Sequence, residues 1–414
     1  MLTKLKLYVI THKGSIIFSM LRYVELFFTS LILFLLAKRL GTLEYGKTVK
    51  DFLYITMVPF LAVGVAQSTA KHYSKSSTQN EKDNVLLFPL FVYLLITPIA
   101  LALGFFYLNN PAWLLISFVG ILNLVRNYFI IFFRLRERNL HSNIAGIIYT
   151  IFFFGLFYFY CHSASDYFKI NFIAVLVFLL VALSLSFGYI KSINLLHFKN
   201  YLQANFKLLF NDSIKIYLVS LINIFLINHG RLVFQYLLQP QELGVLQFYD
   251  NVANVATILI STFCLYYQAN FIAAFHKDNA ILKKMNTKFI KILGLILLAS
   301  NIIILPICCL IIKKYFTQYT QSYFLVALMF NYRVILFSTY LVSLFLITIN
   351  KELKFFLYIF VFAIVMWGCG NILHLIFKQD YLIQLCLYFV ISIVSYLITY
   401  FFLWSNLNKK NNTK

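Results

Sequence analysis

Long apolar stretches follow one another along almost the whole chain, separated by short segments rich in charged residues, Asn or Pro. A stretch of about 20 apolar residues is long enough to cross the hydrocarbon core of a bilayer as a helix. Such stretches lie at 15–37, 48–70, 85–108, 112–133, 141–161, 170–190, 213–230, 245–275, 289–312, 322–349, 352–376 and 381–404. They predict an all-α polytopic membrane protein of about twelve transmembrane helices.

The composition agrees with lipid as the solvent. Hydrophobic residues make up 62% of the 414 residues and charged residues only 12%, whereas soluble domains have about 45–50% and about 25%. The net charge of +22 would suggest nucleic acid on a soluble protein. Here the basic residues sit in short loops between apolar stretches, so membrane topology explains them and we expect no nucleic-acid partner.

The distribution of Lys and Arg predicts the orientation. Most lie in the terminal segments and in every second loop, and cytoplasmic segments are the ones that accumulate such residues. We therefore expect both termini in the cytoplasm of a bacterial cell, with the protein in the inner membrane. The basic N-terminal residues lead into a stretch of spanning length. We expect this stretch to be the first transmembrane helix and not a cleaved signal peptide. The first outer loop, with Lys38, Arg39, Lys47 and Lys50, runs against the rule.

The loops divide the chain into two sets of six spans. We predict an N-terminal six-helix bundle at 1–192, a linker at 193–212, a C-terminal six-helix bundle at 213–404 and a basic cytoplasmic tail at 405–414. The linker alternates apolar with polar and basic residues. This pattern favours an amphipathic helix on the inner leaflet, and a plain polar connection is the alternative.

A weak internal repeat supports the division. Leu40–Gly46 reads LGTLEYG and Leu238–Gly244 reads LQPQELG, so that Leu, Glu and Gly recur 198 residues later. Both segments follow the first span of a six-span set. Since six is even, both sets enter the membrane in the same direction and the repeat must be parallel, with a central cavity between the bundles.

These segments also carry a resemblance. Residues 37–46 (AKRLGTLEYG) resemble the exit of the first helix in polysaccharide transporters of the MATE/MOP flippase superfamily, and residues 230–244, which begin Gly-Arg, resemble the exit of their seventh helix. The most similar group is that of Wzx-type O-antigen flippases. Gly230 stands where that family commonly has Asp, and Thr42 where it commonly has Pro.

The resemblance implies a function in lipopolysaccharide and O-antigen biosynthesis. Such proteins flip an undecaprenyl-diphosphate-linked oligosaccharide from the cytoplasmic to the periplasmic leaflet by alternating access. The resemblance implies that membrane lipid surrounds the protein and that an O-antigen polymerase and a chain-length regulator are its partners. It implies no cofactor, with H⁺ or Na⁺ as a possible coupling ion. A multidrug or small-molecule exporter of the same superfamily is one alternative, and an O-antigen polymerase-type membrane enzyme is another.

Arginines inside spans are the candidate substrate-binding residues. Charges within a membrane span are costly and usually face a cavity or a partner. Arg22, Arg126 and Arg333 fall inside the predicted spans, and a guanidinium binds phosphate oxygens through two parallel hydrogen bonds while it stays protonated. We add Lys215, near the inner end of its span. The structural alternative is that Glu25 neutralises Arg22 and that neighbouring amides satisfy Arg126.

Carboxylates inside spans are the candidates for ion coupling. Glu25 lies well inside the first span, whereas Asp51 and Asp250 lie near the outer ends of the second and eighth. A carboxylate in the membrane can carry a proton or sodium ion. An ion pair between Glu25 and Arg22 explains Glu25 equally well.

Neither catalysis nor metal binding is expected. The six cysteines and eight histidines show no spacing typical of metal ligands, and there is no Asp-x-Asp motif or phosphate-binding glycine loop. We predict no catalytic residues, no metal site and no enzyme activity. Pro59, Pro89, Pro98 and Pro306 interrupt spans and are candidate bends.

Overall fold

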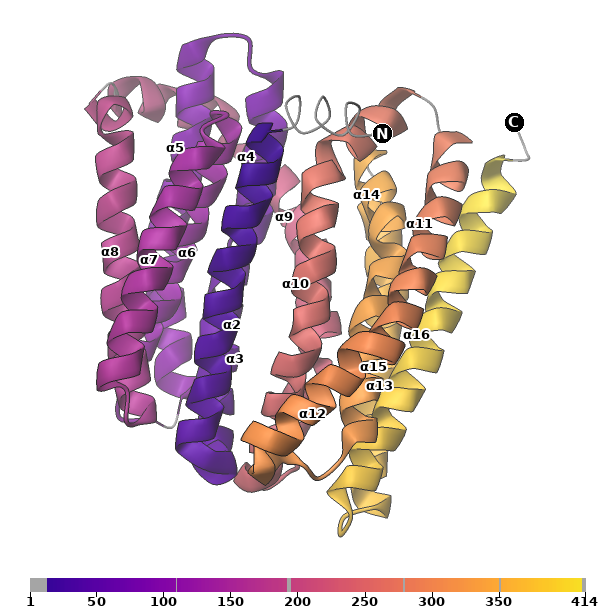
Figure 1. Ribbon diagram of the computed structural model, residues 1–414. Coiled ribbons are helices and arrows are strands. Elements are labelled where there is room, and N and C mark those ends of the chain that lie inside the picture. Colours follow the sequence, from indigo (N-terminus) through magenta and orange to yellow (C-terminus); the bar gives the residue numbers. More distant parts are fainter. Residues whose placement is uncertain (1–12, 109, 192–194, 278–279, 350, 412–414) are drawn as a thin grey trace, which may run out of the picture. The chain divides into compact units, whose positions relative to one another are not determined.

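A computed structural model describes residues 13–108, 110–191, 195–277, 280–349 and 351–411. Every secondary-structure element within those ranges is a helix. The chain divides into two compact units (Figure 1). Unit 1 contains residues 1–39 and 50–217, and unit 2 contains residues 40–49 and 218–414.

Unit 1 is a bundle of long helices joined by short loops. Its described helices are α2 (Lys13–Lys47), α3 (Val49–Phe60), α4 (Val63–Lys75), α5 (Gln79–Tyr107), α6 (Trp113–Leu135), α7 (Asn139–Tyr160), α8 (Ala164–Lys191) and the first half of α9 (Leu195–Phe234). The turn between α4 and α5 ends in a capping box. Thr78 accepts from the backbone N–H of Glu81, whose carboxylate accepts from the N–H of Thr78, so two unpaired donors at the start of α5 are satisfied.

Unit 2 repeats the bundle with more interruptions. It contains the second half of α9, then α10 (Pro240–Lys277), α11 (Ala280–Ala299), η1 (Ser300–Ile304), α12 (Leu305–Tyr315), η2 (Thr317–Tyr319), α13 (Tyr323–Leu336), η3 (Phe337–Thr339), α14 (Tyr340–Thr348), α15 (Glu352–Ile376) and α16 (Tyr381–Asn411). The interruption η1 is a π-helical turn that ends two residues before Pro306. Proline lacks an N–H and so disturbs the hydrogen bonding of the preceding turn.

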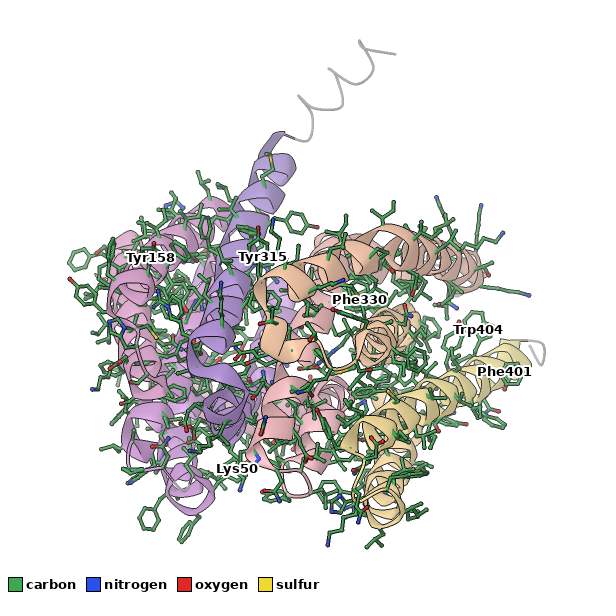
Figure 2. The ribbon with its side chains drawn as sticks, turned by 60° about the horizontal axis from the view of Figure 1, so that its bottom comes forward. Lys50, Tyr158, Tyr315, Phe330, Phe401 and Trp404 are labelled. Atoms are coloured by element: carbon green, nitrogen blue, oxygen red, sulfur yellow. The ribbon has the colours of Figure 1, made fainter. Side chains whose placement is uncertain are left out.

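The predicted spans coincide with these helices. Within the described ranges, nine helical segments are long and apolar enough to cross a membrane, with α11 to α12 and α13 to α14 counted as one segment each. The remaining predicted spans fall on α3 with α4, on α9 and on α10. Large apolar side chains such as Tyr158 and Phe401 are more than half exposed on the outer faces of their units (Figure 2). This is the distribution expected of a protein surrounded by lipid.

The second predicted span is not one continuous helix. It breaks at Leu61 and Ala62 into α3 and α4, two residues after Pro59. The chain can approach α9 closely here, because a side chain at Gly64 would overlap the backbone of Ser213. Pro89 and Pro98, in contrast, lie inside the unbroken helix α5. Of the four candidate bends, Pro59 and Pro306 therefore adjoin interruptions of the helix.

The predicted linker belongs to a longer element. Residues 195–212 form the first part of α9, which continues without a break to Phe234. The division between the units falls inside this helix, between Tyr217 and Leu218. Residues 193–194 and the end of the predicted tail, 412–414, lie outside the described residues.

The C-terminal end of α2 groups with unit 2. Within this helix Gly41 has a positive φ of 74°, a conformation that glycine adopts without strain. Beyond the resulting kink, Gly46 lies against the backbone of Pro240, and Gly244 lies against the backbone of Thr42. Thr42 and Pro240 are also 198 residues apart. The two repeat segments thus contact each other through equivalent residues, as in an isologous two-fold interface.

Candidate functional site

Glu25 is the centre of a charged cluster in unit 1. It lies on α2 and is 3% exposed. Arg22, three residues earlier on the same helix, donates from Nη1 to Glu25 Oε2 at 2.5 Å. Arg126 on α6 donates from Nη2 to Glu25 Oε1 at 2.6 Å. One carboxylate thus holds two guanidinium groups, and the three side chains together carry one surplus positive charge.

Aromatic and small residues shape this first cluster. The Arg126 guanidinium lies 3.9 Å from the ring centroid of Tyr149, within the range of a cation–π contact. Gly146, one turn earlier on α7, leaves room for the carboxylate, because a Cβ there would lie 2.7 Å from Glu25 Oε2. The Nε of Arg126 is buried without a hydrogen-bond partner among the described residues.

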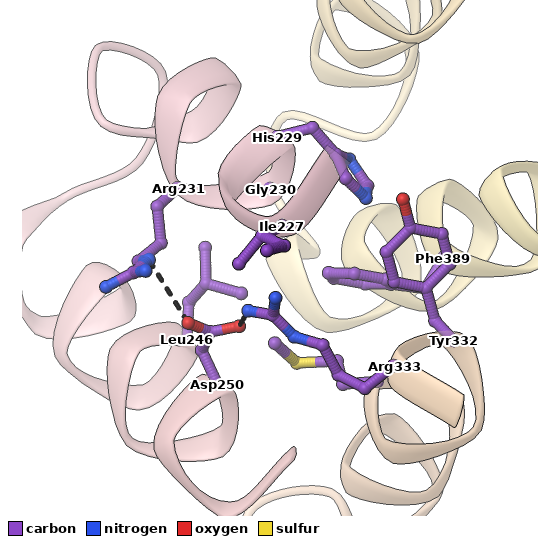
Figure 3. Close-up of a pocket in the computed structure, with 10 residues that line it drawn as sticks. Ile227, His229, Gly230, Arg231, Leu246, Asp250, Tyr332, Arg333 and Phe389 are labelled. Atoms are coloured by element: carbon purple, nitrogen blue, oxygen red, sulfur yellow. Dashed lines mark hydrogen bonds and ion pairs between the residues drawn. The ribbon is translucent and has the colours of Figure 1, made fainter. Parts of the chain in front are cut away.

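Asp250 is the centre of a second cluster, in unit 2. It lies on α10 and is 6% exposed. Arg333 on α13 donates from Nη2 to Asp250 Oδ1. Arg231 on α9 brings its Nε to 3.1 Å from Asp250 Oδ2, close enough for an ion pair although the N–H is not aligned for a hydrogen bond (Figure 3). Two arginines again share one carboxylate.

A chain of amides holds Arg231 in place. Its Nη1 donates to Gln247 at 3.0 Å and its Nη2 donates to Asn228. Gln247 donates in turn to Asn251 at 3.1 Å, and Asn251 donates to the hydroxyl of Tyr45 at 2.6 Å. Tyr45 belongs to the repeat segment at the end of α2. This network therefore connects the charged cluster to the contact between the two repeat segments.

His229 lies beside the second cluster. Its Nδ1 is 2.7 Å from the hydroxyl of Tyr388, and its ring packs edge-on against Tyr332. The side chain is 1% exposed. Gly230, the next residue, allows the ring of Phe389 to pack closely, since a Cβ there would lie 2.9 Å from it, and both residues line a small cavity. The cavity is lined by residues of both arginine-bearing helices (Figure 3).

The arginines of the two clusters come from corresponding helices. In each unit one arginine comes from the first long helix, α2 or α9, and the other from the fourth span, α6 or α13. The carboxylate comes from the first span in unit 1 and from the second in unit 2. Arg22 lies near the start of α2, whereas Arg231 lies near the end of α9. The clusters are therefore similar in composition without being copies at equivalent positions.

Six of the seven predicted candidates fall into three groups. Arg22, Glu25 and Arg126 form the first cluster, and Arg333 and Asp250 belong to the second. Asp51 lies apart from both, where it is buried in unit 1 and accepts from Asn110 Nδ2 at 2.9 Å. The side chain of Lys215 lies outside the described residues.

Sequence reasoning does not find Arg231 as a site residue. The predicted seventh span ends at residue 230 and places Arg231 in a loop, whereas α9 continues to Phe234. A usable signal is the helical spacing of polar residues at Asn228, Arg231 and Gln235. A second set follows on the next helix at Gln247, Asp250 and Asn251. Two polar stripes on adjacent apolar helices indicate a buried polar contact.

The fold is similar to that of solved transporters. No family profile matches the chain, and no curated protein matches it. A multidrug resistance MATE family transporter of the MOP superfamily, in its inward-facing conformation, matches with a TM-score of 0.66 at 12% identity, over 96% of this chain and 99% of its own. The chain has the fold of the MATE transporters.

Two further structures agree. A MATE transporter in its bent conformation matches with a TM-score of 0.63 at 14% identity, over 96% of this chain and 95% of its own. A mutant of VcmN, a Vibrio cholerae MATE transporter, matches with a TM-score of 0.55 at 13% identity, over 98% of this chain and 99% of its own. The prediction of an all-α polytopic membrane protein with about twelve transmembrane helices is confirmed.

Proposed function

We propose that this protein transports an undecaprenyl-diphosphate-linked oligosaccharide from the cytoplasmic to the periplasmic leaflet of a bacterial inner membrane, by alternating access. The MATE fold supports the transport step. The pairing of two arginines with one carboxylate in each unit supports an anionic substrate. That surplus of positive charge inside membrane-embedded bundles is the observation that carries the proposal.

Arginine clusters are suited to a diphosphate. A guanidinium offers several donors in a fixed plane and is more weakly hydrated than an ammonium, so it binds phosphate oxygens without a large cost of desolvation. Glu25 and Asp250 keep the arginines ordered while no substrate is bound. An incoming phosphate then competes with each carboxylate for the same donors, and the surplus charge favours the phosphate.

The same competition provides a route to ion coupling. A carboxylate that loses its arginine partners within a membrane is costly as an anion, so it gains from binding H⁺ or Na⁺. Glu25 and Asp250 are our candidates for this role. Asp51, which accepts from the neutral amide of Asn110, is the third.

Two other functions make different predictions. One of the solved structures with this fold is described as a multidrug resistance transporter. Export of cationic drugs would favour clusters with surplus negative charge, the opposite of what Arg22, Glu25 and Arg126 provide. A polymerase-type enzyme would join repeat units instead of moving them. Polymerase and chain-length regulator are, in our proposal, separate partners.

The deciding experiment uses a bacterial host deleted for this gene. The lipid-linked oligosaccharide is located by leaflet-specific labelling, and surface glycan is measured. We expect the oligosaccharide to accumulate in the cytoplasmic leaflet and the gene to relieve this. Single repeat units at the surface without long chains would instead identify a polymerase. Normal surface glycan combined with drug sensitivity would identify a drug exporter.

A further inference from the structure

One terminal nitrogen of Arg333 has no partner among the residues that the structure describes. Nη2 donates to Asp250, but Nη1 is buried without a hydrogen-bond acceptor within the described part of the chain. The residue is only 2% exposed. Figure 3 shows this nitrogen turned away from Asp250, toward the segment that carries Ile227 and Gly230. A buried, unpaired donor on a charged group costs more than one on a neutral group.

The cluster around it has an unbalanced charge. Arg231 and Arg333 contribute two positive charges and Asp250 contributes one negative charge. The other polar groups bonded to the cluster, Asn228 and Gln247, are neutral amides. An isolated charge in a low-dielectric interior is strongly unfavourable, so the cluster gains from a counter-ion.

The space beside Arg333 is small. The cavity measures about 10 Å³, close to the minimum that holds one water molecule. Its apolar walls include Ile227, Met329 and Phe389. A chloride ion is larger than a water molecule, so it fits only if Met329 moves, and the methionine side chain adapts easily to irregular spaces.

We infer that unit 2 binds a single halide ion, with chloride as the ion available in the cell, in the cavity beside Arg333. The ion accepts a hydrogen bond from Nη1 of Arg333 and neutralises the surplus charge of the Arg231–Asp250–Arg333 cluster. In the proposed transport cycle a phosphate that binds Arg231 and Arg333 takes the place of this ion, whereas binding of the ion itself does not require transport. The halide is a resident ion that stabilises unit 2.

The test measures unfolding of the purified full-length protein in detergent. Sodium chloride, sodium bromide and sodium gluconate are compared at equal ionic strength. We expect chloride and bromide to raise the apparent unfolding temperature by about 2 °C or more relative to gluconate, in a saturable manner, because a ligand that binds only the folded state stabilises it. Bromide crystals should then show an anomalous-scattering peak beside Arg333 Nη1.

Two variants connect the effect to this residue. Arg333→Lys keeps the charge but removes the second terminal nitrogen, and it should lose the halide response. Arg136→Lys is the matched control, since Arg136 also pairs with a single aspartate, Asp83, but lies in unit 1. It should keep the full response. If Arg333→Lys does not fold, the bromide peak in the unmodified protein decides.

Three results would overturn the inference. The first is equal unfolding temperatures of the unmodified protein in chloride and gluconate. The second is an undiminished halide response in Arg333→Lys. The third is a bromide derivative with no anomalous peak in the cavity, where a water molecule would then be the partner of Nη1.

Discussion

Gly46 and Gly244 lie backbone to backbone, each packed against the segment that carries the other. The position of a Cβ at Gly46 is taken by the carbonyl of Pro240, and that at Gly244 by the carbonyl of Thr42. Adding the 198-residue offset of the repeat converts Thr42 into Pro240 and Gly46 into Gly244, so the two contacts are equivalent. Only glycine permits so close an approach of two backbones.

A larger residue at this contact should destabilise unit 2. For Gly46→Ala the added methyl overlaps main-chain atoms, which cannot rotate away as a side chain can. We expect a loss of about 1–3 kcal/mol in the free energy of unfolding, the usual cost of overpacking. Thermal unfolding followed by size-exclusion chromatography measures it. Gly155→Ala is the control, because no atom lies within 4 Å of the position that its Cβ would take, and an equal loss there would contradict the contact.

Removal of Glu25 should be more harmful to stability than removal of either arginine. Glu25→Gln leaves the largely buried Arg126 and the partly exposed Arg22 without a counter-charge. Breaking a fully buried pair costs about 3–5 kcal/mol, and the exposure of Arg22 to solvent reduces its share of that cost. Arg22→Gln leaves Glu25 paired with Arg126 and removes the surplus charge. The unfolding temperatures of the purified variants test the order. A Glu25→Gln variant as stable as Arg22→Gln would show that the cluster is not desolvated.

Arg126→Gln should abolish export while the protein still folds. Glu25 keeps Arg22 as its partner, so no buried charge is left unpaired. A lost charge-assisted hydrogen bond to substrate is worth about 1.5–3 kcal/mol, or a reduction of tenfold or more in binding. Surface glycan in the deletion host, normalised to membrane protein level, is the measurement. Arg136→Gln, outside the cluster, should export normally. Normal glycan in Arg126→Gln would reject the proposed role.

A methyl group at Gly146 should displace the Glu25 carboxylate. It would lie 2.7 Å from Glu25 Oε2, so Glu25 must move and its pairing with Arg22 and Arg126 is disturbed. We expect Gly146→Ala to reduce export severalfold. Gly155→Ala on the same helix, α7, is the matched control and should leave export unchanged. Equal export in both variants would show that the position of Glu25 is unimportant.

An ion pair outside the predicted spans should depend on pH. Burial alone would raise the pKa of Asp212, but hydrogen bonds and charges from Lys71 and His72 outweigh it and lower the pKa. The stabilisation is therefore present above the ordinary value of 3.8 and is lost as pH falls through the lower folded-state pKa. Asp212→Asn should be less stable than the unmodified protein at neutral pH, and the difference should shrink as the pH falls below that ordinary value. A constant difference would contradict this.

The sequence predicts the helices more completely than it predicts the site. Apolar stretches mark spans because lipid offers no hydrogen bonds to backbone groups, so a segment that crosses it must be a continuous helix or be covered by protein. The Arg22–Glu25 pair follows from the three-residue spacing on one helix. The partnership of Glu25 with Arg126 cannot be predicted in this way, since it joins residues 101 positions apart. Arg231 is not found because a charged residue marks the end of a span when only the sequence is considered. Pro59 is a candidate bend from the sequence, but the sequence does not distinguish it from Pro89 and Pro98, which lie inside an unbroken helix.

The assignment of Leu40–Val49 to unit 2 has a consequence for synthesis. These residues leave the ribosome early, but their contacts at Pro240 and Gly244 are made about two hundred residues later. The first bundle must therefore insert with the end of α2 unpaired until the second half of the chain emerges. Two halves produced as separate polypeptides would each lack part of unit 2. Their stable folding should require that both be present in the same membrane.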